Sequence, residues 1–229
     1  MAIVVYLETE NGNFKKSALE ASSYGRKLAD EINTSLYGIA FNSKDSITIK
    51  KYGVEKLINI KTDHVFDAKI YADLLCKNFK DLEGTIFITG SSADSRYIFP
   101  IVSISLDASY ATNVIEFPSS ISPLVIKRSA FTNKGFVFTE LTTTYKIIGI
   151  LNNSFGIFES ERKLEVKDYI PESLGSNVQV ESITENEEKI SIADAEIVVS
   201  GGRGLKGPEN WSLLEDLAKT LGAATACSK

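Results

Sequence analysis

The residues best suited to chemistry lie near the end of the chain, in "AEIVVSGGRGLKGPENWSLLEDLAKTLGAATACSK", residues 195–229. An apolar strand pattern leads into Gly202, Arg203 and Gly204, and Pro208 stands where a helix could begin. Glycines in a strand-to-helix turn let a ligand approach the backbone, and the amino terminus of a helix favours an anion. The guanidinium of Arg203 adds a fixed charge and planar donors suited to phosphate or to a ring carbonyl.

Spacing alone leaves two interpretations of this turn open. "GGRG" lacks the spaced glycines of a dinucleotide-binding fingerprint and the Lys-Ser/Thr of an NTPase phosphate loop. The turn therefore either approaches a ligand or is a tight connection whose glycines serve backbone conformation only.

Other reactive side chains form no constellation in the sequence. His64, Cys76 and Cys227 are too few and too far apart for a usual metal site, and no nucleophile, base and orienting group can be assembled as a catalytic set. We expect Cys76 to be a core residue. We interpret Cys227 as a small buried hydrophobe rather than a redox group, and His64 as a solvated or hydrogen-bonded loop residue.

The elements that position the turn begin with a regular alternation of strands and helices. Apolar runs predict strands at residues 3–7, 35–41, 54–60 and 84–90, the third with alternating polarity. Apolar spacing of three and four predicts helices at residues 14–33, 67–79 and 95–107, the last with Pro100 near its first turn. This order predicts an α/β fold with a mainly parallel sheet and flanking helices.

Later segments break this alternation. Between Ser109 and Leu151, four strand patterns follow one another through short turns, which predicts added β-hairpins. We place a domain boundary near Ala193, which divides the chain into domains 1–193 and 194–229. In the second domain, a helix that ends at Gly222 is expected to bury Trp211, Leu214, Leu217, Ala218 and Leu221.

Composition restricts the class of protein. The chain has 229 residues, 43% of them hydrophobic, and a formal net charge of −5. That charge argues against nucleic-acid binding, which needs clustered lysine and arginine. The sequence shows no signal peptide and no apolar run long enough to span a membrane, and two cysteines do not make a disulfide framework, so we expect a cytoplasmic protein.

The tail of the chain is similar to a known family. "VVSGGRGLKGPENWSLLEDLAKTLGAATACSK" resembles the alpha subunit of electron transfer flavoprotein, in which a strand leads into "SGGRGL", a helix, "LGAA" and a turn with serine and arginine. "VYLETENGNFKKSALEASSYGRKLA", "KYGVEKLINI" and "SSADSRYIFPIVSISLDASYATNVIEF" are similar to earlier parts of that family. The resemblance covers the whole chain and is most specific at the tail.

This resemblance implies a nucleotide-hydrolase-like first domain that pairs with a beta subunit, and a flavodoxin-like second domain that holds FAD. It implies an electron carrier, not an enzyme, that takes electrons from acyl-CoA dehydrogenase-like donors in fatty acid β-oxidation. A quinone oxidoreductase-like protein would be the acceptor. Arg203 and Ser228 match residues that contact the flavin nucleotide in the family, and Gly202 and Gly204 flank that arginine. Lys229 matches a family arginine and lacks its planar fork, which puts flavin tuning there in doubt.

A second departure from the family is Ser95–Arg96–Tyr97, where the family has Gly-Arg-Asp, so we interpret this turn as structural or interfacial. Because only 36 residues follow the boundary, we expect an incomplete FAD domain that binds FAD weakly or not at all by itself. The alternative is a nucleotide-binding or subunit-association module without redox activity.

Overall fold

The computed structural model describes residues 2–63, 65–172, 175, 178, 180–182, 192 and 195–227. The chain divides into two compact units, residues 1–179 (unit 1) and 180–229 (unit 2), and each is described by itself. The predicted boundary between 193 and 194 falls on two residues outside the described ones and stays a prediction.

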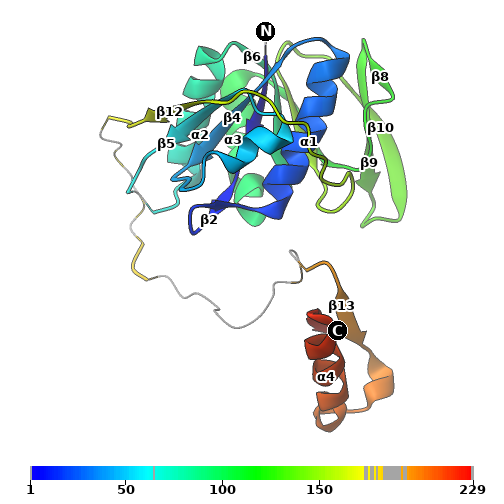
Figure 1. Cartoon of the computed structure of the whole chain (residues 1–229). Coiled ribbons are helices and arrows are strands. Elements are labelled where there is room, and N and C mark those ends of the chain that lie inside the picture. The colour runs from blue at the N-terminus through cyan, green and yellow to red at the C-terminus, as the bar shows by residue number, and fades with distance from the viewer. Residues whose placement is uncertain are drawn as a thin grey trace. The chain divides into compact units, whose positions relative to one another are not determined.

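Unit 1 is built on a large, mainly parallel sheet with helices on both faces, as the sequence predicts (Figure 1). Seven parallel strands run in the order β7 (Ser109–Val114), β11 (Lys146–Ile150), β6 (Gly84–Gly90), β1 (Ala2–Tyr6), β4 (Ser35–Phe41), β5 (Lys56–Ile60) and β12 (Glu165–Tyr169). The strand order reverses direction at β1, between β6 and β4.

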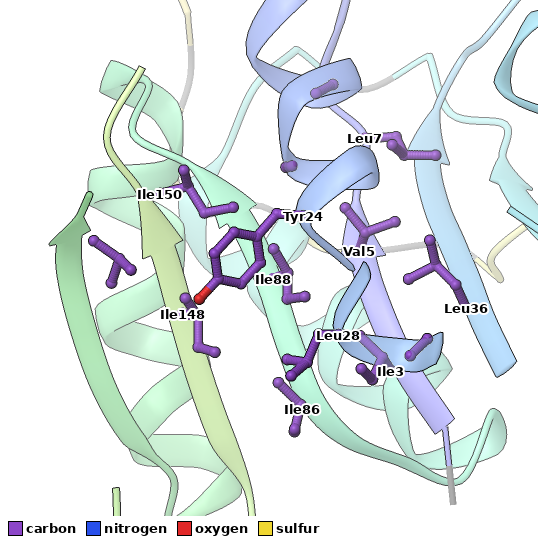
Figure 2. Packing of buried hydrophobic residues seen from close by; sticks show 14 of the residues in the cluster. Ile3, Val5, Leu7, Tyr24, Leu28, Leu36, Ile86, Ile88, Ile148 and Ile150 are labelled. Atoms are coloured by element: carbon purple, nitrogen blue, oxygen red, sulfur yellow. The ribbon is translucent and has the colours of Figure 1, made fainter. Parts of the chain in front are cut away.

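Alternate residues of the central strands enter two separate cores. On one face, Ile3 and Val5 of β1 pack with Tyr24 and Leu28 of α1 (Lys16–Glu31). Figure 2 shows this core, with Tyr24 and Leu28 lying over isoleucines of β6 and β11. On the other face, β1 packs against residues of α2 (Ala68–Asp81) and α3 (Ala93–Leu106). Burial on both faces explains why these strands read as continuous apolar runs.

Two expectations for unit 1 need correction, and one strand is additional. Pro100 lies in the interior of α3, because Ser92 caps the helix by accepting the Ser95 N–H at 3.0 Å and the helix starts at Ala93. Strand β5 is buried along 57–60 rather than alternating, because Leu57 on one face and Ile58 and Ile60 on the other enter the two cores of unit 1. The charged segment around residue 165 forms the additional strand, β12, which pairs with β5 in parallel.

The predicted hairpins lie at the other edge of the sheet (Figure 1). Strand β9 (Leu124–Ala130) pairs antiparallel with β10 (Gly135–Leu141) along its whole length, and the short β8 (Ser120–Ile121) also pairs with β9. A second small hairpin joins β2 (Thr9–Glu10) to β3 (Asn13–Phe14), and a 3-10 turn, η1, covers Thr48–Tyr52.

Unit 2 is one strand–helix–strand element. Its parallel strands are β13 (Val198–Gly201) and β14 (Ala224–Cys227), and between them lie η2 (Arg203–Leu205), η3 (Pro208–Asn210) and α4 (Ser212–Leu221). Gly222 ends α4 in the left-handed conformation (φ 62°), as expected for this cap. Of the predicted helix face, Leu214 and Ala218 are buried, but Leu217 and Leu221 are 51% and 47% exposed. A two-stranded sheet contacts only a narrow strip of a helix, so the wider apolar stripe is not covered by the described residues of this unit.

Candidate functional site

The candidate site is the turn that joins β13 to α4. The Leu205 N–H donates to the Gly202 carbonyl (3.0 Å), and the Lys206 N–H donates to the Arg203 carbonyl (3.1 Å). The Asn210 side chain then donates to the Leu205 carbonyl (2.8 Å), which ties η2 to the segment before the helix. These bonds hold the backbone of Arg203 in one conformation at the end of the strand.

The physical reason for a glycine differs between the positions of this turn. A Cβ on Gly201 would stand 2.3 Å from Leu205 Cδ1 and 2.9 Å from both Leu214 Cδ1 and Trp211 Cζ3, so packing excludes a side chain there. Gly202 has an extended conformation (φ −121°) that any residue can adopt, and a Cβ on Gly202 or on Gly204 would meet no heavy atom within 4 Å. Neither local strain nor packing within the described residues therefore requires glycine at 202 or 204.

Gly202 borders a groove of about 490 Å³ on unit 2. Its lining consists of Gly201, Gly202, Arg203, Leu205, Lys206, Gly207, Pro208, Trp211 and Cys227. Arg203 and Lys206 are exposed and bring two positive charges to a largely apolar and glycine surface. A groove of this size, with few charged groups on an apolar wall, has the character of a small-molecule site.

Several donors of the turn have no partner among the described residues. Among the described residues, nothing accepts a hydrogen bond from the Arg203 guanidinium or from the backbone N–H groups of Gly202, Arg203 and Gly204. Successive free N–H groups beside a cation form a concave donor set for an anion. The arrangement can therefore bind a phosphate or a carbonyl-rich ring.

The structure places only part of the predicted site. Ser228, Lys229 and His64 lie outside the described residues, so whether Ser228 adjoins Arg203 stays a prediction. The interpretation of Cys227 as a buried residue is wrong: its side chain is exposed at the groove, because β14 is one of only two strands that the described part of its sheet contains. Cys76 is a core residue of α2 as expected, and burial raises the pKa of its thiol to about 11.

Unit 1 carries a charged cluster that the sequence patterns did not reveal. At the carboxyl ends of the parallel strands, where the strand order reverses, Lys15 Nζ lies 2.7 Å from Glu8 Oε1, and Asp94 stands in the first turn of α3. Burial, and then the charge of Glu8, raise the pKa of Asp94. Burial alone would lower the pKa of Lys15, but its hydrogen bond to Glu8 and the nearby carboxylates raise it. Ligands of open α/β sheets often bind at such a position, but two carboxylates and one paired lysine do not favour a phosphate.

The Ser95–Arg96–Tyr97 turn lies in the first turns of α3. The Ser95 hydroxyl is buried and hydrogen-bonds with the hydroxyls of Thr89 and Ser92, both at 3.0 Å, which gives it a structural role. Tyr97 is 67% exposed. Within the described part of the chain, no helix has the length and apolar character needed to cross a membrane, and no three His, Cys, Asp or Glu side chains gather as a metal site.

Family models match residues in both units of the chain. Residues 3–174 match the electron transfer flavoprotein domain, and residues 191–229 match the electron transfer flavoprotein FAD-binding domain. The chain is 25% identical over 236 residues to the probable electron transfer flavoprotein subunit alpha, mitochondrial, of Caenorhabditis elegans, covering 99% of this chain and 68% of the relative. It is 23% identical over 237 residues to electron transfer flavoprotein subunit alpha of Pseudomonas aeruginosa (100% and 74%) and 25% identical over 244 residues to protein FixB of Clostridium saccharobutylicum (98% and 71%). Because the first domain match spans most of unit 1, the chain belongs to the electron transfer flavoprotein family, and its relatives include alpha subunits of that family.

Proposed function

We propose that this chain acts as an electron transfer flavoprotein alpha subunit, a carrier rather than an enzyme, and that it binds FAD in the groove of unit 2. We further propose that unit 1 (domain 1–193 in the sequence prediction) associates with a beta subunit to form a heterodimer. The family match supports the general role, and the names of the compared relatives support the position of alpha subunit.

The observation that carries the proposal is the Arg203 turn. It combines an exposed guanidinium and three backbone N–H groups that have no partner among the described residues with two glycines that the fold itself does not require. A pyrophosphate or a flavin ring carbonyl offers the acceptors that such donors need. The match of residues 191–229 to a FAD-binding domain identifies which ligand of this chemistry to test.

In this proposal, the residues of the chain bind and orient the cofactor. Bound FAD would supply the electron-accepting and electron-donating chemistry, as cofactors generally do. Arg203 would hold an acceptor group of the cofactor, while Gly202 and Gly204 would let its atoms approach the backbone. Ser228 and Lys229 are proposed as further contacts from the sequence resemblance alone. Arg203 is exposed at an open groove, so we expect weak FAD binding by the chain alone and tighter binding with the beta subunit.

The wider setting is also a proposal. We propose acyl-CoA dehydrogenase-like donors of fatty acid β-oxidation and a quinone oxidoreductase-like acceptor, which follow from the family resemblance. A cytoplasmic location is proposed from the two unpaired cysteines; the nematode relative is named as mitochondrial, so cell fractionation has to decide.

A visible absorption spectrum tests the cofactor assignment. The purified chain is mixed with the beta subunit and excess FAD, desalted, and scanned for flavin absorption. We expect flavin to be retained, and Arg203→Ala to weaken its binding by about 10- to 100-fold, since hydrogen bonds to a charged group contribute about 1.5–3 kcal/mol. Lys219→Ala, which removes a lysine of α4 that does not line the groove, is the matched control.

Two results would count against the proposal. Equal flavin retention by Arg203→Ala and Lys219→Ala would remove Arg203 from the site. Binding of a nucleotide without flavin absorption, in a stable complex, would favour the alternative of a nucleotide-binding or association module without redox activity.

A further inference from the structure

The hairpin formed by β9 and β10 ends the sheet of unit 1. Strand β10 pairs with β9 on one side, and among the described residues no strand pairs with its other side. Figure 1 shows this hairpin at the sheet edge opposite to β12. A long, unpaired strand edge offers backbone donors and acceptors to another chain, and proteins usually protect such an edge with charges, proline or a covering segment.

Most of the exposed side chains at the start of β10 are apolar rather than protective charges. One face of the hairpin joins the core of unit 1, where Leu124, Ile126 and Leu141 are buried. The other face should then be polar. Instead, Phe136 and Phe138 lie on this outer face, and they are 63% and 62% exposed.

Apolar exposure continues along the strand and into the turn. Val137, between the two phenylalanines but on the opposite face of the strand, is 44% exposed, and Phe131 at the tip is 86% exposed. Phe131 and Thr132 both have φ 53°, a left-handed conformation that is unfavourable for aromatic and β-branched residues. We call Phe131, Phe136 and Phe138 the hairpin surface.

The lysine beside the hairpin surface is already paired. Lys127 Nζ lies 4.8 Å from the centre of the Phe136 ring and 2.6 Å from Glu116 Oε1. The cation is therefore neutralised by a carboxylate and shields one face of the ring. Such a surface suits an apolar protein partner better than a phosphate-rich one.

We propose that the hairpin surface is a contact site for the beta subunit, with an extended strand of that subunit against the free edge of β10. This inference rests on the proposed function, because it takes the chain to be one of two different subunits. The compared relatives are named as subunit alpha, a name for one chain of an assembly. Both the free edge and the aromatic side chains match the needs of a strand-adding partner, since backbone bonds supply affinity and side-chain pockets supply specificity.

The test measures binding of the purified chain to the electron transfer flavoprotein beta subunit of the same organism, by isothermal titration calorimetry and gel filtration. We expect Phe136→Asp combined with Phe138→Asp to weaken binding at least about 30-fold, as loss of central aromatic anchors does. The control is Val166→Asp, which places one such carboxylate at an exposed position (42%) of β12, the strand at the opposite edge of the sheet. This control should change binding less than about threefold, because rim and remote positions contribute little. Thermal unfolding of each variant confirms that unit 1 is folded.

Three outcomes would overturn the inference. They are equal binding by the double variant and Val166→Asp, no binding of the beta subunit by the unmodified chain, or a self-associated chain that the double variant makes monomeric while beta-subunit binding is unchanged. The flavin test of Arg203→Ala concerns unit 2 and is measured separately. If Arg203→Ala retains as much flavin as Lys219→Ala does, the cofactor site is refuted and the hairpin contact is unaffected.

Discussion

Glu20 on α1 should be one of the most important single side chains for the stability of unit 1. It is 4% exposed, and its carboxylate accepts three backbone hydrogen bonds from the loop after β11. Oε1 accepts from the N–H of Phe155 (2.7 Å) and of Gly156 (3.0 Å), and Oε2 accepts from the N–H of Asn153 (2.8 Å). The loop in turn packs Phe155 against Tyr24, with ring centres 5.0 Å apart.

The expected magnitude follows from the three bonds. A buried N–H that loses its partner costs about 1–3 kcal/mol, and partial access of water reduces the sum, so we expect Glu20→Ala to lower the free energy of unfolding by about 3–5 kcal/mol. Glu20→Gln keeps one oxygen but turns an NH₂ group toward a third donor. It should lower the free energy of unfolding by about 1–3 kcal/mol.

Urea unfolding followed by far-UV circular dichroism measures both losses. Trp211, the single tryptophan, belongs to unit 2, so circular dichroism is the readout chosen for unit 1. Glu31→Ala, an exposed acid at the end of the same helix, is the control and should change stability by less than about 0.5 kcal/mol. A loss below about 1 kcal/mol for Glu20→Ala would show that the three bonds do not hold the loop.

Two further predictions concern titrating groups. Burial alone would raise the pKa of Glu55, but its hydrogen bonds from Arg26 (2.7 Å) and Ser35 (2.9 Å) lower it below its usual value. The ionised Glu55 carboxylate therefore contributes its full stabilisation above the unfolded-state pKa and loses it as the pH falls through the lower folded-state pKa. In an acid titration, Glu55→Gln should lose less stability below about pH 4.5 than the unmodified chain does. An acid profile identical to that of the unmodified chain would contradict this. The thiol of Cys76, with a pKa raised to about 11, should react with a thiol reagent at about pH 8 far more slowly than exposed Cys227; Cys227→Ser should abolish the fast phase, and fast labelling that remains would refute the assignment.

Much of unit 1 can be predicted from local sequence patterns. The predicted strands 35–41 and 84–90 agree with β4 and β6 to the residue, because both faces of these strands are buried and the apolar runs have sharp ends. The predicted helix ends lie within about two residues of the observed ones, the usual uncertainty of helix boundaries. The start of α3 is predicted too late, at residue 95, because proline suits the first turn of a helix and Pro100 favours a start near it. In the structure, the capping bond to Ser92 starts the helix at Ala93.

At the candidate site, the sequence indicates Arg203 and its glycines but not why each glycine is there. Only the packing of Leu205, Trp211 and Leu214 separates Gly201, which the fold requires, from Gly202. The exposure of Cys227 likewise depends on how few strands of the described chain lie beside β14.

The sequence by itself determined the periodicity of the elements, the order of strands and helices, and the Arg203 turn, because these depend on residues close together in the chain. Tertiary structure decided which groups from distant segments meet, such as Glu20 with the loop after β11 and Glu8 with Asp94. It also decided which side chains of β10 remain exposed. A strand pattern of consecutive apolar residues indicates burial on both faces, and only the structure shows that Phe136, Val137 and Phe138 of this edge strand stay exposed within the described chain.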